Sequence, residues 1–181
     1  MNNLKNMFSV GVSLFNVQNL NNAHLKNHCI EKYSNNKQKN FDDKILIDLK
    51  SAFLNEGVNH VKQILGTNKD IQLKIHKIWG NTHLDESISV PHTHRESIIS
   101  AVYYLTKGKL TFLNPYQSAL AHIYNKDIEN YNEFNSDIWT CDMVEGDMVM
   151  FNSHLQHYAH YDGQDKHERM SIACDMIMIN D

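Results

Sequence analysis

From residue 71 onward, apolar and polar residues alternate in short segments, and this pattern constrains the fold more than any other feature. In the first segment Ile71, Leu73 and Ile75 are separated by Gln72 and Lys74. Successive side chains of a β-strand point to opposite faces, so the alternation is typical of a half-buried strand. Further strands are predicted at residues 87–92, 98–105, 109–113, 138–143, 146–151 and 169–177.

The preceding part of the chain has a different pattern. Residues 1–40 are rich in Asn and Lys and are predicted to form turns and solvated surface. Between residues 42 and 65 the apolar residues recur at steps of three and four, which predicts one or two amphipathic helices. Asp42 or Asp43 would cap the first helix, and Gly57 would divide the segment.

These patterns predict a single domain over residues 1–181, with an N-terminal helical support region at 1–66 and a β-rich core at 67–181. Helices followed by many short strands are typical of a barrel or sandwich with helices packed against it.

Composition excludes several classes of protein. The formal net charge is −4 and the pI is about 6.3, so no broad positive field is expected to attract nucleic acid. No segment approaches the roughly 20 apolar residues of a membrane span, and the N-terminus is a poor signal peptide. Cys29, Cys141 and Cys174 are widely spaced, with no CxxC pair. We therefore expect a cytoplasmic protein.

Histidine is unusually frequent, with 12 in the chain, and two clusters suggest a metal site. His92, His94 and Glu96 lie two residues apart, so on an extended backbone they share one face. Two such ligands and a third from a distant strand can hold one metal and leave positions open. His157 is the preferred distant ligand, with His154 and His160 as rivals. Ligands of this type suit Fe(II), but also Mn, Ni or Zn.

A second motif, Arg169-Met-Ser171, begins the last predicted strand. An arginine that faces the inside of a barrel needs an anionic partner, and a dicarboxylic acid chelating iron would provide one.

With these motifs in order, the sequence resembles the 2-oxoglutarate- and Fe(II)-dependent oxygenases, in particular a small, partly phage-encoded group related to the prolyl 4-hydroxylases. The resemblance covers about residues 71–177. It rests on these two motifs together with Trp79-Gly-Asn81, Ser100-Ala-Val-Tyr-Tyr-Leu105, Leu110-Thr-Phe-Leu-Asn-Pro115, Gly146-Asp-Met-Val-Met-Phe151 and His157.

The resemblance implies a mainly β fold with N-terminal helices, built on a double-stranded β-helix, which is a jelly-roll or cupin-like barrel. It implies Fe(II) as cofactor and 2-oxoglutarate as co-substrate. It also implies that the cytoplasm is that of a bacterium or of a phage-infected host cell. His92 and His157 would bind the iron, and Arg169 with Ser171 would hold the distal carboxylate of 2-oxoglutarate. Tyr104 would assist Arg169, although the parity of Tyr103 and Tyr104 does not settle which of them faces inward.

One residue departs from the wider superfamily, which usually has His-x-Asp or His-x-Glu where this chain has His92-Thr-His94. Three ligand sets are open: His92, His94 and His157; His94 and Glu96 with His157; or His92 and His157 with water or Glu96. We favour the three histidines, because this His-x-His spacing resembles the small group in register.

The expected reaction is hydroxylation of a substrate by O2, coupled to decarboxylation of 2-oxoglutarate to succinate, with residues 115–136 as a lid. The substrate stays open between a peptide or amino-acid side chain and a small molecule. The oligomeric state is also open, with a homodimer as one option. The alternatives are a cupin-type three-histidine dioxygenase that uses no 2-oxoglutarate, or a non-catalytic jelly-roll binding module. Arg169 favours the oxygenase over the cupin.

Overall fold

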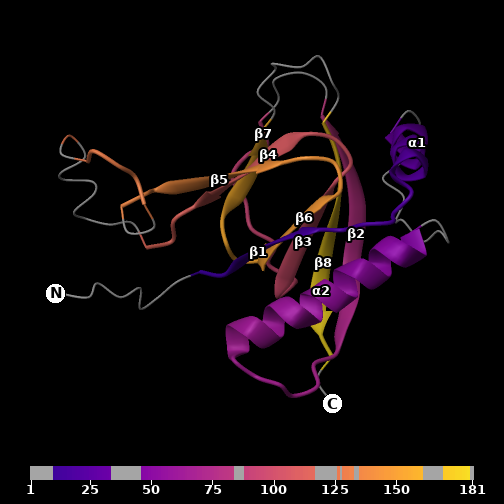
Figure 1. Ribbon diagram of the computed structural model, residues 1–181, viewed down its shortest axis with the longest axis horizontal. Helices are drawn as coiled ribbons and strands as arrows, with labels where there is room; N and C mark the ends of the chain where they lie inside the picture. Colours follow the sequence, from indigo (N-terminus) through magenta and orange to yellow (C-terminus); the bar gives the residue numbers. More distant parts are fainter. Residues whose placement is uncertain are drawn as a thin grey trace.

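The computed structural model describes residues 10–33, 46–83, 88–116, 126, 128–132, 135–160 and 169–179. These residues form two helices and eight strands (Figure 1). In chain order they are β1 (Val12–Asn16), α1 (Asn22–Tyr33), α2 (Ile47–Leu65), β2 (Leu73–His83), β3 (Ile99–Tyr104), β4 (Gly108–Leu113), β5 (Ile138–Met143), β6 (Asp147–Asn152), β7 (His157–His160) and β8 (Arg169–Met178).

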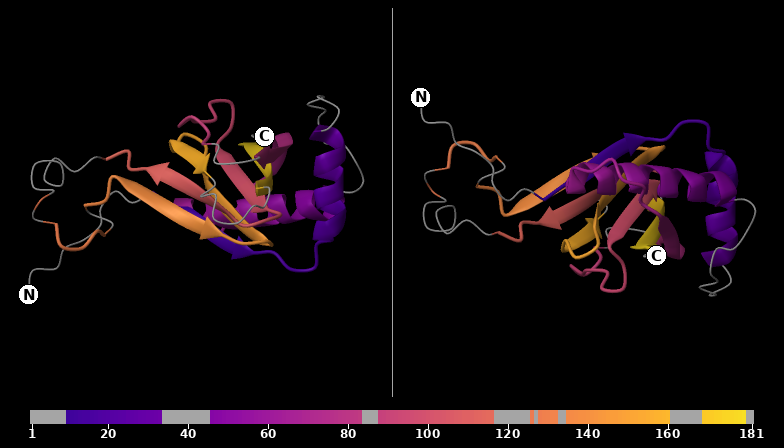
Figure 2. Two further views of the ribbon diagram at one scale, coloured as in Figure 1. Left: turned by 90° about the horizontal axis from the view of Figure 1, so that it is seen from above. Right: turned by 90° about the horizontal axis from the view of Figure 1, so that it is seen from below.

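The strands form two antiparallel sheets. The larger sheet has the order β1-β6-β3-β8-β2, and the smaller has the order β5-β4-β7. Both helices lie on the outer side of the larger sheet, where α2 runs across the strands (Figures 1 and 2). The fold is therefore mainly β with N-terminal helices, as predicted.

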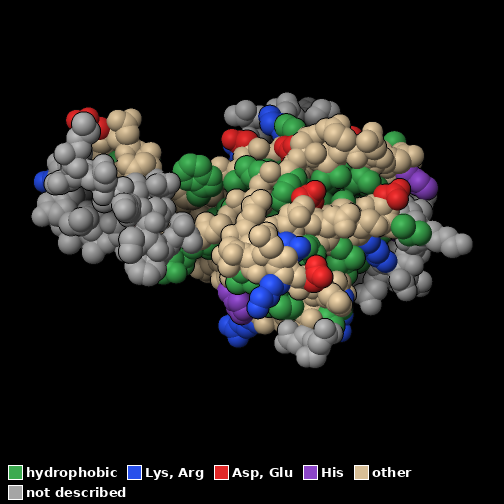
Figure 3. All heavy atoms as spheres, turned by 60° about the horizontal axis from the view of Figure 1, so that its bottom comes forward, with side chains coloured by type: hydrophobic (Ala, Val, Ile, Leu, Met, Phe, Trp, Pro, Cys, Tyr) green, Lys and Arg blue, Asp and Glu red, His purple; other side chains and the backbone are tan. Residues whose placement is uncertain are grey.

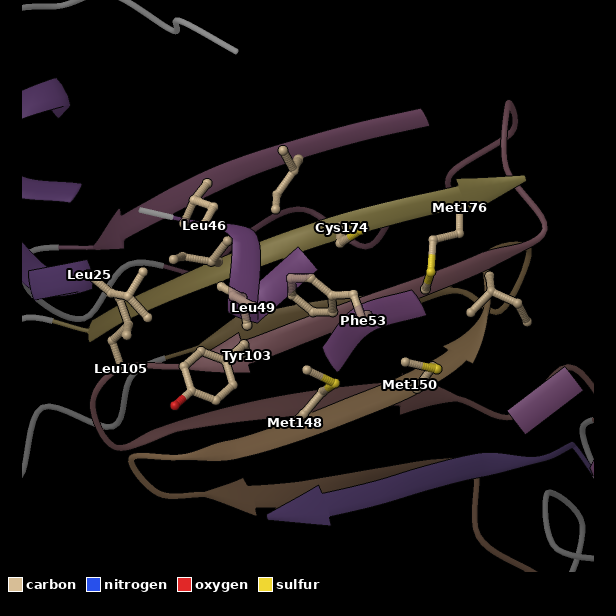
Figure 4. Packing of buried hydrophobic residues seen from close by; sticks show 14 of the residues in the cluster. Leu25, Leu46, Leu49, Phe53, Tyr103, Leu105, Met148, Met150, Cys174 and Met176 are labelled. Carbon is tan, nitrogen blue, oxygen red and sulfur yellow. The ribbon is translucent and has the colours of Figure 1, made fainter. Parts of the chain in front are cut away.

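The strand β8 shows how the sequence builds the two layers. All residues from Arg169 to Met176 are buried, because both faces of this strand are covered. Its even-numbered residues are apolar and pack in one cluster with α1 and α2, part of which is shown in Figure 4. In the buried part of the strand, residues 169–176, the odd-numbered residues face the smaller sheet, and three of these four are polar: Arg169, Ser171 and Asp175, with Ala173 between them. Burial of polar groups is costly unless they are paired, so this face marks a functional interior.

The helix α2 is continuous through Gly57, so the prediction that this glycine divides the segment is wrong. A Cβ at Gly57 would lie 2.9 Å from Leu73 Cδ1 and 3.0 Å from Met176 Sδ. Glycine at this position therefore allows the helix to approach the sheet closely. The helix ends at Gly66, whose φ of 60° is the left-handed conformation that glycine adopts readily. Asp42 and Asp43, the predicted caps, lie outside the described residues.

The prediction that residues 1–40 form only turns and surface is wrong for two segments. β1 pairs with β6 and extends the larger sheet, although it lies within the region expected to be helical. The helix α1 buries Leu25 and Cys29 against the sheet. Both elements are stabilised by tertiary contacts rather than by a strong local pattern.

Two other predictions need correction. The strand predicted at 87–92 is not formed by its described residues, 88–92, which make only the isolated bridges Ile88↔His160 and His92↔His157. The short strand β7 was not predicted, and β2 extends to residue 83. Most of the lid expected at 115–136 lies outside the described residues, as do residues 161–168 before β8.

On the face of the molecule shown in Figure 3, basic and acidic side chains are scattered rather than gathered into a patch of one charge. Within the described residues, no helix combines the length and the hydropathy of a membrane span.

Candidate metal centre

Three histidines from two segments of the chain meet: His92 and His94 come from the segment before β3, and His157 begins β7. His92 and His157 form an isolated antiparallel bridge, with backbone N···O distances of 3.0 and 3.1 Å. Their ring centroids lie 4.6 Å apart, and each lies 5.1 Å from the ring of His94. One ring nitrogen from each histidine lies within 4.8 Å of the other two, so the three can bind a single metal ion.

The hydrogen bonds of the three rings fix which nitrogen is available. Nδ1 of His92 donates to the carbonyl of Val90 at 2.8 Å, and Nδ1 of His157 donates to the carbonyl of Leu155 at 2.8 Å. Nδ1 of His94 donates to Oδ1 of Asp175 at 2.6 Å. A ring that donates from Nδ1 has its lone pair on Nε2, so each histidine is in the tautomer that binds metal through Nε2.

Burial favours the neutral form of the His157 imidazole, which is the form that binds a metal. Its side chain is buried, and desolvation lowers its pKa from 6.5 to about 4, against the raising effect of the hydrogen bond to Leu155. Phe151 and Phe112 contact the ring, with centroids at 4.6 and 6.2 Å. In the metal-free protein His157 is therefore neutral at pH 7, and no proton competes with a metal for this nitrogen.

The rival ligands lie elsewhere. The Glu96 side chain is 87% exposed and contacts Nε2 of His76 on β2 at 3.4 Å. His154 is exposed, and His160 packs beside Tyr158 at a ring distance of 5.7 Å. The geometry therefore brings together His92, His94 and His157 and leaves out Glu96.

A second group of polar residues lies on the same interior face, toward the start of β8. Arg169 is 2% exposed and Ser171 is fully buried. Nη2 of Arg169 donates to the Tyr104 hydroxyl at 3.4 Å, and its guanidinium carbon lies 5.4 Å from the Tyr104 ring. Arg169 Nε and Ser171 Oγ have no hydrogen-bond partner among the described residues. A buried guanidinium with a vacant donor is suited to bind an anion.

Tyr104, and not Tyr103, faces this group. Tyr104 pairs with Ser171 in the register of β3 and β8, whereas Tyr103 points to the other side and donates to Asn22 of α1 at 2.6 Å. Burial raises the pKa of Tyr104 above its usual value of 10, although Arg169 acts in the opposite direction. The phenol therefore keeps its proton and can donate a hydrogen bond to an anion.

Gly108 at the start of β4 leaves room for the arginine. A Cβ at this position would lie 2.9 Å from Nε of Arg169 and 3.0 Å from Cε1 of Tyr104. Such contacts are closer than heavy atoms normally tolerate, so Gly108 allows the guanidinium to lie against the smaller sheet.

Asp175 and Ser100 are not among the site residues predicted from the sequence. They are partners in the register of β3 and β8 and lie beside His94. The signal that could have revealed them was the polar alternation of β8, since Asp175 shares the parity of Arg169 and Ser171.

Residues 77–175, more than half of the chain, match the protein family described as "Putative 2OG-Fe(II) oxygenase". The chain belongs to this family. The segment that matches the oxygenase family contains the three clustered histidines and also Tyr104, Arg169 and Ser171. None of the curated proteins matches the chain.

Solved structures resemble this chain at low sequence identity. SnoN, a non-heme alpha ketoglutarate dependent epimerase from nogalamycin biosynthesis, has a TM-score of 0.63 and 10% identity, covering 93% of this chain and 76% of SnoN. A prolyl-4-hydroxylase from Pseudomonas putida has a TM-score of 0.60 and 15% identity, covering 95% and 90%. HygX from Streptomyces hygroscopicus, with iron bound, has a TM-score of 0.59 and 12% identity, covering 92% and 82%. These matches confirm the predicted double-stranded β-helix fold.

Proposed function

We propose that this protein is an Fe(II)- and 2-oxoglutarate-dependent dioxygenase that hydroxylates a peptide or amino-acid side chain or a small molecule. In this proposal His92, His94 and His157 bind the iron. Arg169, Ser171 and Tyr104 bind the distal carboxylate of 2-oxoglutarate. The observation that carries the proposal is the buried Arg169, whose Nε has no acceptor among the described residues, on the same strand β8 whose Asp175 hydrogen-bonds to His94.

The residues present fit both groups. The three imidazoles are hydrogen-bonded at Nδ1, so each could bind an iron through Nε2, and three protein ligands would leave room at the metal for a bidentate 2-oxo acid and for O2. The unpaired Arg169 Nε and Ser171 Oγ, with the protonated Tyr104 hydroxyl, can together donate to a carboxylate.

The strand between the two polar groups also fits the co-substrate. Asp175, beside His94, and Ser171, beside Tyr104, are separated on the interior face of β8 by Ala173, which pairs with Val102. Ala173 and Val102 are both buried in the hydrophobic cluster between the two sheets. Small apolar side chains at this position suit the two methylene groups of 2-oxoglutarate.

When bound, Fe(II) and 2-oxoglutarate supply the oxidising chemistry, in which O2, 2-oxoglutarate and a substrate C–H bond yield succinate, CO2 and a hydroxylated product. The protein itself contributes orientation. The three Nδ1–H hydrogen bonds hold the rings in place, and Arg169 and Tyr104 set the position of the co-substrate. Phe112 and Phe151 keep water from one side of His157.

A cupin-type dioxygenase could also use three histidines, and this ligand set is the observation in its favour. Such an enzyme has no use for an anion-binding group at the start of β8. The buried Arg169 and the family match support the oxygenase.

An anaerobic titration tests the proposal. Fe(II) should bind at one equivalent, and adding 2-oxoglutarate should produce the weak visible absorption of an iron-bound 2-oxo acid. Succinate should produce no such band, because it lacks the 2-oxo group. Iron binding with no response to 2-oxoglutarate would favour the cupin, and failure to bind iron would leave a non-catalytic module.

A further inference from the structure

The hydrogen bond of His94 differs in kind from those of the other two histidines. His92 and His157 donate to neutral backbone carbonyls. His94 donates to the Asp175 carboxylate at 2.6 Å, and both side chains are largely buried, at 12% and 11% exposed. A hydrogen bond to an ionised acceptor is shorter and roughly twice as strong as one between neutral groups.

A chain of three hydroxyl groups ends on the same carboxylate oxygen. Ser97 Oγ donates to Ser153 Oγ at 2.9 Å, Ser153 and Ser100 share a hydrogen bond of 2.9 Å, and Ser100 Oγ donates to Asp175 Oδ1 at 2.6 Å. With Ser153 as the donor to Ser100, every proton in the chain points toward Asp175. Hydrogen bonds that run in one direction polarise and strengthen one another, so the chain holds the charge of Asp175 at a fixed place behind His94.

The Asp175 carboxylate lies next to the one position at which this chain departs from the ligand pattern of the wider superfamily. His94 occupies the place where the wider superfamily usually has Asp or Glu. An iron held by three neutral imidazoles would lack the negative charge that such a carboxylate brings.

We propose that Asp175 supplies this negative charge through His94, as a positioning residue one side chain away from the metal. The inference rests on the proposed function, because it takes His92, His94 and His157 as the ligands. The Asp175 carboxylate increases the basicity of the ring by accepting the Nδ1 proton, and so strengthens the Nε2–metal bond. The serine chain keeps the carboxylate aligned with His94.

Anaerobic Fe(II) affinities of matched variants test this role. Asp175→Asn removes the charge but can still accept a hydrogen bond. The control is Asp142→Asn on β5, an exposed residue near Lys109 that makes the same change in net charge away from the histidines. Loss of a partner behind a metal ligand typically weakens binding by about 10- to 100-fold. We expect a loss in this range for Asp175→Asn and a change below about twofold for Asp142→Asn.

A spectrum separates this role from a purely structural one. In the Zn(II)-loaded protein, labelled with 15N in histidine, the Nδ1 proton of His94 should lie well downfield of those of His92 and His157, which donate to neutral carbonyls. In Asp175→Asn it should move toward the other two. A residue that only supports the fold would change the melting temperature of the metal-free protein without this movement.

The outcomes distinguish this inference from the proposed function. If the wild-type protein binds neither Fe(II) nor Zn(II), the metal site itself is wrong. If it binds metal but Asp175→Asn binds Fe(II) within about threefold of wild type, the role of Asp175 is refuted. If Asp175→Asn does not fold, the wild-type spectrum decides, and three similar Nδ1 protons would refute the inference.

Discussion

Arg169 gives the sharpest single test of the co-substrate site. Its guanidinium is 2% exposed, and its only described hydrogen bond is the 3.4 Å contact with Tyr104. In Arg169→Ala, the distal carboxylate of 2-oxoglutarate would be buried with only hydroxyl donors. Truncating one partner of a buried, hydrogen-bonded charge pair costs about 2–5 kcal/mol. About 1.4 kcal/mol corresponds to a factor of ten, so the Kd for 2-oxoglutarate should increase by a factor between about 30 and several thousand.

The assay is an anaerobic titration of the Fe(II)-loaded variants with 2-oxoglutarate. Arg169→Lys should recover only part of the affinity, because lysine restores the charge without the planar donor pair. Lys74→Ala on β2, an exposed residue, removes the same charge and should leave the Kd unchanged. Iron binding should persist in all variants. A Kd for Arg169→Ala within about threefold of wild type, with iron bound, would refute the assignment of 2-oxoglutarate to this site.

The other predictions concern the histidines and the glycine beside the arginine. His157→Ala should lose Fe(II), as measured by iron content, whereas iron near the wild-type level would show that another histidine is the distal ligand. His94→Ala should weaken Fe(II) binding and Glu96→Ala should change it little; the reverse order would move the site to Glu96. Gly108→Ala should weaken 2-oxoglutarate binding by displacing Arg169 while iron stays bound, and unchanged 2-oxoglutarate affinity would contradict the close packing. In the metal-free protein, His157 stays neutral down to its pKa of about 4, whereas in the unfolded chain it is protonated below 6.5. Its contribution to the free energy of unfolding is therefore complete above pH 6.5 and decreases by up to about 3 kcal/mol as the pH falls to 4. Denaturant titrations should show this decrease, and His157→Gln should reduce its slope.

The β-rich core could be predicted because its local pattern is strong. Short segments rich in apolar residues, separated by turn or loop residues, identify β3 through β6 and β8 to within one or two residues. The pattern around β1 and α1 is weak, because Leu25 and Cys29 become core residues only when the sheet is present to cover them. The prediction that Gly57 divides the helix failed for the same reason. The close contact with Met176 that requires a glycine forms only when α2 packs on the sheet.

For the candidate site, the spacing of residues along the chain could be used for prediction, but the register between strands could not. The i, i+2 spacing of His92 and His94 predicts a shared face, and the structure places both near His157, although their role as ligands stays a prediction. The pairing of Ser100 with Asp175 depends on the alignment of β3 and β8, which the sequence does not contain. The parity of Tyr104 could not be assigned because both faces of β3 are buried.

The most direct test of the central claim is an anaerobic crystal structure with Fe(II) and 2-oxoglutarate, with anomalous data at the iron edge. We predict one iron peak bonded to Nε2 of His92, His94 and His157, with the distal carboxylate of 2-oxoglutarate on Arg169 and Tyr104. An iron peak away from the three histidines, or a 2-oxoglutarate molecule that does not contact Arg169, would contradict the account.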